Sequence, residues 1–434
     1  MGVSVSCHTP TPNRMPRLRL ALLLLLAACA SGGGAADPAA EPAQTGGGQT
    51  ATTTDSPWPI KTREHVDLWL HGFAMITQDT TRVPYFRRGY RDQLTTLKNS
   101  AQVTTQLDAN RQALNARLAA NRNLVGAQFL ALYFGNWQEM REVANLFIQA
   151  QGDPQRANSQ QLAQAIATLA GYFPTPADRE WLRVFVASLD DESQKFYHDY
   201  WVQQQRNRAA TLAAVDALWQ QQYRPKLQPF LNGTQQLRGD LLLSLPLDGE
   251  GRTISSTGAV GGGGANLVTV SFPERPADAA EAVYVFVHEV VGALSATAIT
   301  DNTTPNEQRT GAADRLQSAA AVRAGAMLLA RAAPELSEGY ARYYLRSAGA
   351  PATAGTPAAL AAAFPLPDAI RDAIARQIEV VMGGICGGAG GGRTRAGRSS
   401  LARPPAEDAS RRLRPPPGPA PWRAGRPLSG RRAL

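Results

Sequence analysis

The apolar residues that can form a core are confined to the middle of this 434-residue chain. Residues 30–58 are rich in Ser, Gly, Ala, Pro and Thr, and from Gly383 onward the composition becomes mostly Gly, Arg and Pro. Such segments cannot bury enough apolar surface to offset the entropy lost on ordering. We therefore predict a flexible tether over 29–58 and a disordered tail over 387–434, with the fold confined to 59–386.

The formal charge of +9 is distributed very unevenly along the chain. Residues 387–434 hold 11 arginines against two acids, and residues 1–28 hold three arginines and no acid. Residues 29–386 contain 30 basic and 33 acidic side chains, so the predicted folded part is slightly acidic. A basic surface is the usual electrostatic mark of a nucleic-acid-binding protein. Because that excess lies outside the predicted fold, we expect no nucleic-acid partner.

The N-terminus has the three parts of a secretory signal peptide. Arg17 and Arg19 precede an apolar run over 20–26, and two alanines follow before Cys29. The run is too short to cross a bilayer, which needs about 20 residues. We predict that residues 1–28 are a signal peptide, with Met15 as an alternative start.

The stretch Leu26-Ala27-Ala28-Cys29 resembles the lipobox of bacterial lipoproteins. The resemblance implies that the thiol of Cys29 is diacylated and holds the chain on a membrane of the cell envelope. Alanine at position 30 implies the outer membrane in a diderm host, on its periplasmic face or at the surface. The alternative is an ordinary cleaved signal with an incidental cysteine.

The predicted body is mostly α-helical with a small β element. Over 59–239, apolar residues such as Val66, Leu70 and Phe73 recur at helical spacing. Two short β-like runs follow and predict a hairpin or small sheet within 240–273. After it we expect further helices, in one domain or in two closely packed ones (59–239 and 240–386). These helices are predicted over 279–300, 312–332, 335–347 and 367–382.

One apolar segment of the body carries a pattern that suggests chemistry. The sequence Val285-Phe-Val-His288-Glu289-Val-Val-Gly292 resembles the His-Glu-x-x-His helix of zincin metallopeptidases. The resemblance implies that His288 is a zinc ligand and that Glu289 is the general base acting on metal-bound water. Zn²⁺ is expected only if the ligand set is intact.

The sequence departs from the zincin pattern at two positions. Gly292 stands where the second histidine belongs, and Arg323 lies where the following helix would supply a third ligand. Glycine has no donor atom, and a guanidinium is always charged and repels a cation. Other side chains could complete the set, first Glu307 and Asp301, then Asp314, His65, His71 and His198.

A structural interpretation of the same residues stays open. A single His-Glu pair in an apolar helix is typical of a core histidine with a carboxylate partner, or of a buried network with Arg323. Glycine at 292 costs a helix about 1 kcal/mol, which indicates close backbone packing or space for a ligand. The pair His71-Gly72 is interpreted as a packed turn.

Three functional hypotheses remain. The first is a cell-envelope lipoprotein with a zincin-like, degenerate metallopeptidase site; at most the chain is a metallopeptidase-like hydrolase. The second is a non-enzymatic binding or scaffold lipoprotein with a protein or peptide partner. The third is an active, atypical metallopeptidase. Other chemistries lack their residues, since the body has no Gly-x-Ser-x-Gly elbow, no cysteine nucleophile and no dinucleotide fingerprint.

Overall fold

A four-stranded sheet lies at the centre of the fold. In the computed structural model, which describes residues 57–78, 81–254, 266–350 and 355–383, the strand order is β1-β2-β4-β3. The strands are β1 (Ile60–Lys61), β2 (Gly239–Ser244), β3 (Arg252–Ile254) and β4 (Asn266–Ser271). β1, β2 and β4 run parallel to one another, and β3 runs antiparallel to β4.

The β-like runs predicted from the sequence are β2 and β4, so the small sheet is confirmed. The two runs do not form a hairpin with each other. β2 and β4 pair in parallel, with Leu241 opposite Val268. β3 lies between them in the sequence and runs antiparallel to β4 along its other edge, so the chain reverses direction twice between β2 and β4. The sheet also recruits β1 from the other end of the body, which the local sequence did not predict.

Both faces of the sheet are covered, so its strands are apolar on both sides. Leu241, Leu243 and Val268 belong to one hydrophobic core, whereas Leu242 and Leu267 belong to the other. Alternate residues of a strand point to opposite faces. In a parallel sheet that is buried on both faces, the sequence of each strand is nearly continuously apolar, as it is in β2.

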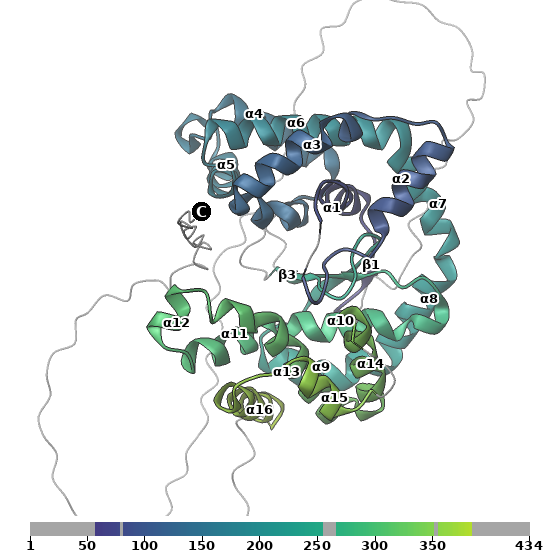
Figure 1. Cartoon of the computed structure of the whole chain (residues 1–434), viewed down its shortest axis with the longest axis vertical. Coiled ribbons are helices and arrows are strands. Elements are labelled where there is room, and N and C mark those ends of the chain that lie inside the picture. The colour runs from purple at the N-terminus through teal and green to yellow at the C-terminus, as the bar shows by residue number, and fades with distance from the viewer. Residues whose placement is uncertain (1–56, 79–80, 255–265, 351–354, 384–434) are drawn as a thin grey trace, which may run out of the picture. The chain divides into compact units, whose positions relative to one another are not determined.

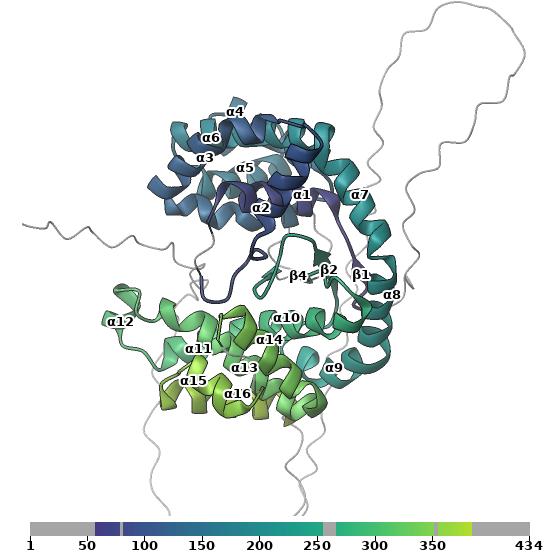
Figure 2. The same cartoon turned by 45° about the vertical axis from the view of Figure 1, so that its right-hand side comes forward.

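One helical layer comes from the first half of the chain (Figures 1 and 2). Its helices are α1 (Glu64–Ile76), α2 (Tyr90–Ser100), α3 (Gln106–Ala120), α4 (Trp137–Gln149), α5 (Gln160–Tyr172) and α6 (Pro176–Glu192). α1 is the central helix of this layer, and Gly72 lies within it. The prediction of a packed turn at His71-Gly72 is therefore wrong. A glycine is needed there because a Cβ would approach Leu189 and Phe185 of α6 to 2.7 Å.

The other helical layer comes from the second half of the chain and confirms the mostly helical prediction. Its helices are α10 (Ala280–Val290), α11 (Gly292–Asp301), α12 (Pro305–Arg309), α13 (Gln317–Ala332), α14 (Ser337–Ser347), α15 (Pro357–Ala363) and α16 (Asp368–Gly383). The predicted helix over 279–300 is divided at Val291. The apolar segment Pro276–Asp301 is long enough to cross a membrane, but 67% of its most apolar window is buried, which is typical of a core helix.

The two layers are joined by α7 (His198–Asn207) and α8 (Ala209–Leu218), which run along one side of the sheet, and α9 (Arg224–Gly233) follows within the second layer (Figure 2). Trp219 and Phe230 of this stretch pack in the core of the second layer, so the two cores do not divide at residue 239. π-helical segments precede α7 and α9, at Ser193–Tyr197 and Trp219–Tyr223.

The body begins before the end of the predicted tether. The tether was expected to include Trp58, but that side chain is fully buried. Its indole packs edge-on against Phe286, with ring centroids 5.3 Å apart, and its Nε1 donates to Gln236 O at 3.2 Å. The signal peptide, Cys29, the rest of the tether and the tail over 387–434 lie outside the described residues.

Candidate functional site

His288 and Glu289 lie near the C-terminal end of α10, on the helix that packs against β4. The His288 side chain is only 6% exposed, and its Nδ1 is 3.0 Å from Glu289 Oε1. Its ring stacks on Tyr344 of α14 at a centroid distance of 5.4 Å. His288 Nε2 is buried and has no hydrogen-bond partner among the described residues.

The loop between β2 and β3 closes over this pair. The backbone N–H of Gly251 donates to Glu289 Oε1 at 3.0 Å, and the hydroxyl of Tyr344 donates to Gly249 O at 3.1 Å. Glu289 Oε1 is thus shared between an imidazole and a backbone amide. This carboxylate fastens α10 to the loop.

A second carboxyl group in the same loop faces the histidine. Burial raises the pKa of Glu250, against the opposite influence of the His288 charge. Burial also disfavours the His288 imidazolium, but Glu289 and Glu250 outweigh it and raise the pKa of His288. The site therefore holds one proton-binding imidazole between two carboxyl groups. Sequence reasoning missed Glu250, for which the only signal was an acid in the Asp248-Gly-Glu-Gly turn between two strands.

The position that would carry the second zinc ligand is open. Gly292 follows the break in the helix at Val291, and a Cβ built on it meets no atom within 4 Å. Of the two alternatives left open at Gly292, close backbone packing is therefore wrong, and space beside the residue is present.

The acids proposed to complete the ligand set serve other roles. Glu307 caps the N-terminus of α12, where it accepts from the backbone N–H and hydroxyl of Thr304 at 2.7 Å each. Asp301 is exposed at the end of α11. Arg323 donates to Phe364 O at 3.4 Å and forms no ion pair with His288 or Glu289 in the described part, so the predicted network with Arg323 is wrong. Asp314 lies in a separate short 3-10 turn, Asp314–Leu316.

The remaining histidines also have partners elsewhere. His65 Nε2 is 3.0 Å from Phe134 O, and burial lowers the pKa of His65 to about 4. His198 Nδ1 is 2.8 Å from Glu64 on the surface. Among the residues that the structure describes, no group of three His, Cys, Asp or Glu side chains is placed to hold a metal ion. The donor set present therefore does not fit a zinc site, which needs at least three protein ligands.

A second polar cluster, which the sequence did not reveal, lies inside the first helical layer. The Glu192 carboxylate at the end of α6 is fully buried, with Oε2 2.7 Å from Lys98 Nζ and Oε1 3.1 Å from His71 Nε2. Lys98 Nζ also lies 2.6 Å from Asp108, and His71 Nδ1 lies 3.1 Å from the Tyr90 hydroxyl. Burial alone would raise the pKa of Glu192, but His71 and Lys98 lower it to about 2. With no opening to solvent at the carboxylate, this His71–Lys98–Glu192 network is a structural centre of the layer.

Asp67, one turn before His71 on α1, is a further buried acid. Its Oδ1 accepts from the Ser244 hydroxyl at 2.6 Å and its Oδ2 from Trp201 Nε1 at 2.9 Å. Burial raises the pKa of Asp67 to about 7. These two contacts join α1 to β2 and to α7, so Asp67 ties the first layer to the sheet and to the connecting helix.

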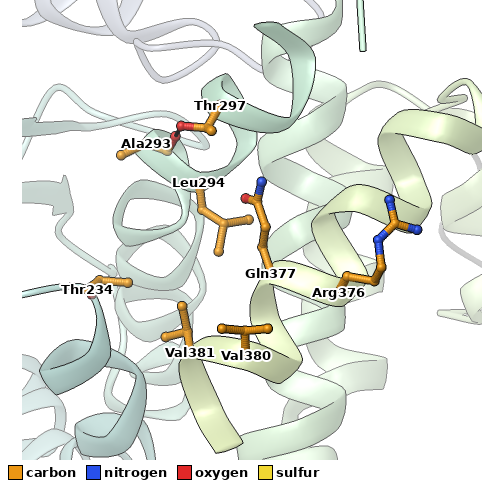
Figure 3. A pocket seen from close by; sticks show the side chains of 8 residues that line it. All are labelled: Thr234, Ala293, Leu294, Thr297, Arg376, Gln377, Val380 and Val381. Atoms are coloured by element: carbon orange, nitrogen blue, oxygen red, sulfur yellow. Dashed lines mark hydrogen bonds between the residues drawn. The ribbon is translucent and has the colours of Figure 1, made fainter. Parts of the chain in front are cut away.

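Two of the surface pockets in the described part of the chain are candidate ligand sites. One, of about 410 Å³, lies between the end of α9, α11 and α16, and its lining is apolar apart from Arg376, Gln377 and two threonines (Figure 3). It holds none of the predicted site residues. The other, of about 370 Å³, lies between the end of α1 and the start of α2 and is lined by three arginines.

Comparison with protein-family models, with curated protein sequences and with solved structures found no match to this chain. The class of protein therefore has to be inferred from the chain itself: a mostly helical fold with a central small sheet and, in its described part, an incomplete His-Glu site.

Proposed function

We propose that this protein is a lipid-anchored protein of the bacterial cell envelope with a zincin-like site that has lost its metal and acts by binding. The observation that carries the proposal is the combination, where α10 meets α11, of a buried imidazole nitrogen without a partner in the described part and an open position four residues further on. His288 uses Nδ1 for Glu289 and leaves Nε2 available, while Gly292 offers space and no donor.

The contacts of Glu289 also support a non-hydrolytic role. A general base has to reach the water that it activates. Glu289 Oε1 instead accepts from Gly251 N–H and faces His288 Nδ1. The partner of such a protein would be a protein or peptide of the envelope.

The alternative, a binding or scaffold lipoprotein in which His288 is a core residue without zincin ancestry, is favoured by the stacking on Tyr344. An active metallopeptidase with an unusual ligand set is the third hypothesis. The three hypotheses predict different zinc contents for the purified protein and its variants.

Zinc content separates these hypotheses. We expect the purified wild-type chain to hold far less than one zinc per molecule, and Gly292→His to hold clearly more. The added imidazole would join His288 Nε2 and the Glu250 carboxyl group, which gives the three protein donors that zinc needs. In that variant residues 288 and 292 lie about one helical turn apart, as two imidazole ligands require. The measurement is elemental analysis after dialysis against a weak chelator. His288→Ala/Gly292→His is the matched control and should lose the zinc.

The other outcomes decide between the alternatives. If Gly292→His gains no zinc although its circular dichroism melt matches wild type, the zincin-like interpretation is wrong and His288 is a core residue. If wild type already holds one zinc that His288→Ala loses, the protein is a metalloprotein and the degenerate site is refuted.

Lipid anchoring is tested at Cys29. We expect Cys29→Ala to move the protein from the membrane pellet to the soluble envelope fraction, because the thiol that would carry the acyl chains is gone. Incorporation of an alkyne-labelled fatty acid should be lost with it. Cys386→Ala is the matched control and should behave as wild type. Unchanged sedimentation and labelling of Cys29→Ala would show that the anchor lies elsewhere or does not exist.

A further inference from the structure

The pocket between the end of α1 and the start of α2 has an unusual lining. Its cavity of about 370 Å³ is bordered by Arg87, Arg88 and Arg91, with Asp92 as the one acid in the lining. We call it the α1–α2 pocket. It shares no residue with the His288 site, so a ligand bound there would be independent of the proposed function.

Arg87 supplies a fixed positive charge at this pocket. Its Nε donates to Leu245 O at 2.8 Å, and its Nη2 donates to Phe272 O. Its Nη1 lies 3.3 Å from Glu274, whose carboxylate is also 3.8 Å from Arg208. All three nitrogens of Arg87 are therefore committed to groups at the ends of β2 and β4, and Glu274, the acid that pairs with it, is shared with Arg208. The charge of Arg87 also acts on the buried carboxyl group of Asp248.

Arg88 and Arg91 keep donors for a ligand. Arg88 uses Nη2 to donate to Ser347 O at 2.7 Å, and Arg91 uses Nη1 to donate to Thr77 O at 3.4 Å. A guanidinium carries five N–H donors, so these bonds leave most of them unused. Both side chains are tethered at one point, which reduces the entropy lost when they bind.

The charges around the pocket are not balanced. Asp92 is the only acid among the described residues that line it, its side chain is 85% exposed, and its carboxylate stands 3.9 Å from Arg91 Nε. That contact is too long for a hydrogen bond and is screened by solvent. A concave site lined mostly by one sign of charge concentrates ions of the opposite sign.

We propose that the α1–α2 pocket binds a phosphate monoester group, carried by a free phosphate ester or by a lipid headgroup. Planar guanidinium groups match phosphate oxygens with paired N–H donors. Two partly free guanidiniums and a third fixed charge suit a doubly charged group with several oxygens better than a singly charged carboxylate. The cavity volume lies in the range of small-ligand sites.

The test is calorimetric titration of the purified full chain with inorganic phosphate at constant ionic strength. We expect Arg88→Gln/Arg91→Gln to weaken binding at least about tenfold, because charge-assisted hydrogen bonds to the anion are lost. Arg111→Gln/Arg309→Gln removes the same charge from exposed positions outside the pocket and should stay within about twofold of wild type. Asp92→Asn should tighten binding by about threefold, since it removes the competing carboxylate.

Three results would overturn the proposal. The first is no saturable binding of phosphate to the wild-type chain. The second is an equal loss of affinity in Arg88→Gln/Arg91→Gln and in the charge-matched control. The third is an affinity that changes neither in Asp92→Asn nor in Arg88→Gln/Arg91→Gln. Because Arg88 also holds Ser347, the single variant Arg91→Gln is titrated alongside, and melting curves show whether each variant is folded.

The source of the phosphate is identified by two further arms. Saturable binding of glycerol 3-phosphate without sedimentation on vesicles indicates a soluble ester. Sedimentation with vesicles containing phosphatidic acid, whose headgroup is a phosphate monoester, but not with phosphatidylcholine vesicles indicates a headgroup, provided that it is lost in Arg88→Gln/Arg91→Gln. Binding in neither arm refutes the site.

Discussion

Replacing Glu192 by alanine is expected to lower the free energy of unfolding by about 3 kcal/mol, the lower end of the range for breaking a buried ion pair. The substitution leaves the Lys98 ammonium, whose side chain is 2% exposed, without the carboxylate that lies 2.7 Å away. It also removes the acceptor 3.1 Å from His71 Nε2. Lys98 keeps Asp108, which lies 2.6 Å away and is 30% exposed, but it loses its fully buried partner and cannot recover the lost hydration. Urea unfolding followed by circular dichroism measures the change.

The control is on the same helix. Glu180 pairs with Arg183 at 2.6 Å, but both side chains are more than half exposed. Exposed pairs of this kind contribute about 0–1 kcal/mol, so Glu180→Ala should change the unfolding free energy by no more than that. Equal effects of the two substitutions would contradict the structural role of the His71–Lys98–Glu192 network.

The same residue predicts a pH dependence with a definite sign. The pKa of Glu192 is lowered from its ordinary value of 4.5 to about 2 in the folded chain. A carboxyl group whose pKa is lowered by folding stabilises the folded chain at pH values above its pKa in the unfolded chain. This contribution is lost as the pH falls towards its pKa in the folded chain. The difference in stability between wild type and Glu192→Ala should therefore be largest above pH 5 and should shrink towards pH 2.

Gly251→Ala is expected to lower the free energy of unfolding by about 3 kcal/mol, at the upper end of overpacking effects. A Cβ at this position would fall far inside the van der Waals distance of the Thr269 carbonyl oxygen on β4. That oxygen belongs to backbone held in the sheet, so it cannot give way without disturbing the β3–β4 pairing. The displaced loop would also withdraw the N–H that Glu289 accepts.

Gly292→Ala is the matched control on the other side of the same site. A Cβ there meets nothing within 4 Å, and alanine favours helix over glycine by about 1 kcal/mol. We expect unchanged or slightly higher stability in thermal and urea unfolding. A loss comparable to that of Gly251→Ala would show that the space beside Gly292 is not open.

Local patterns were sufficient for most of the helices. Apolar spacing and the breaks near Ala333 and Pro367 predicted α13, α14 and α16 to within a few residues. Those signals are contained in one stretch of chain, because a helix bonds only to its own backbone. The divided helix at Val291 and the burial of Trp58 depended on neighbours that are distant in sequence, and the predictions failed at both.

The candidate site was predictable in the same limited sense. His288-Glu289 was recognised because the two residues are adjacent in an apolar helix. Glu250 enters from the β2–β3 loop and Tyr344 from α14, so neither could be placed beside the pair beforehand. The open space at Gly292 likewise depends on the packing around it, and sequence reasoning left close packing and space for a ligand as equal alternatives.

The sequence by itself determined that the fold is mostly helical with a small sheet, and where the one His-Glu pair lies. Composition and periodicity are local quantities and suffice for those conclusions. Only the tertiary structure decided the parallel pairing of β2 with β4 and the arginine-lined α1–α2 pocket. It also brought Glu192 into contact with Lys98 and His71, which lie 94 and 121 positions earlier in the sequence. Each of these features depends on how separate elements pack. Contacts between segments that are far apart in the sequence leave no signal in the local sequence of either segment.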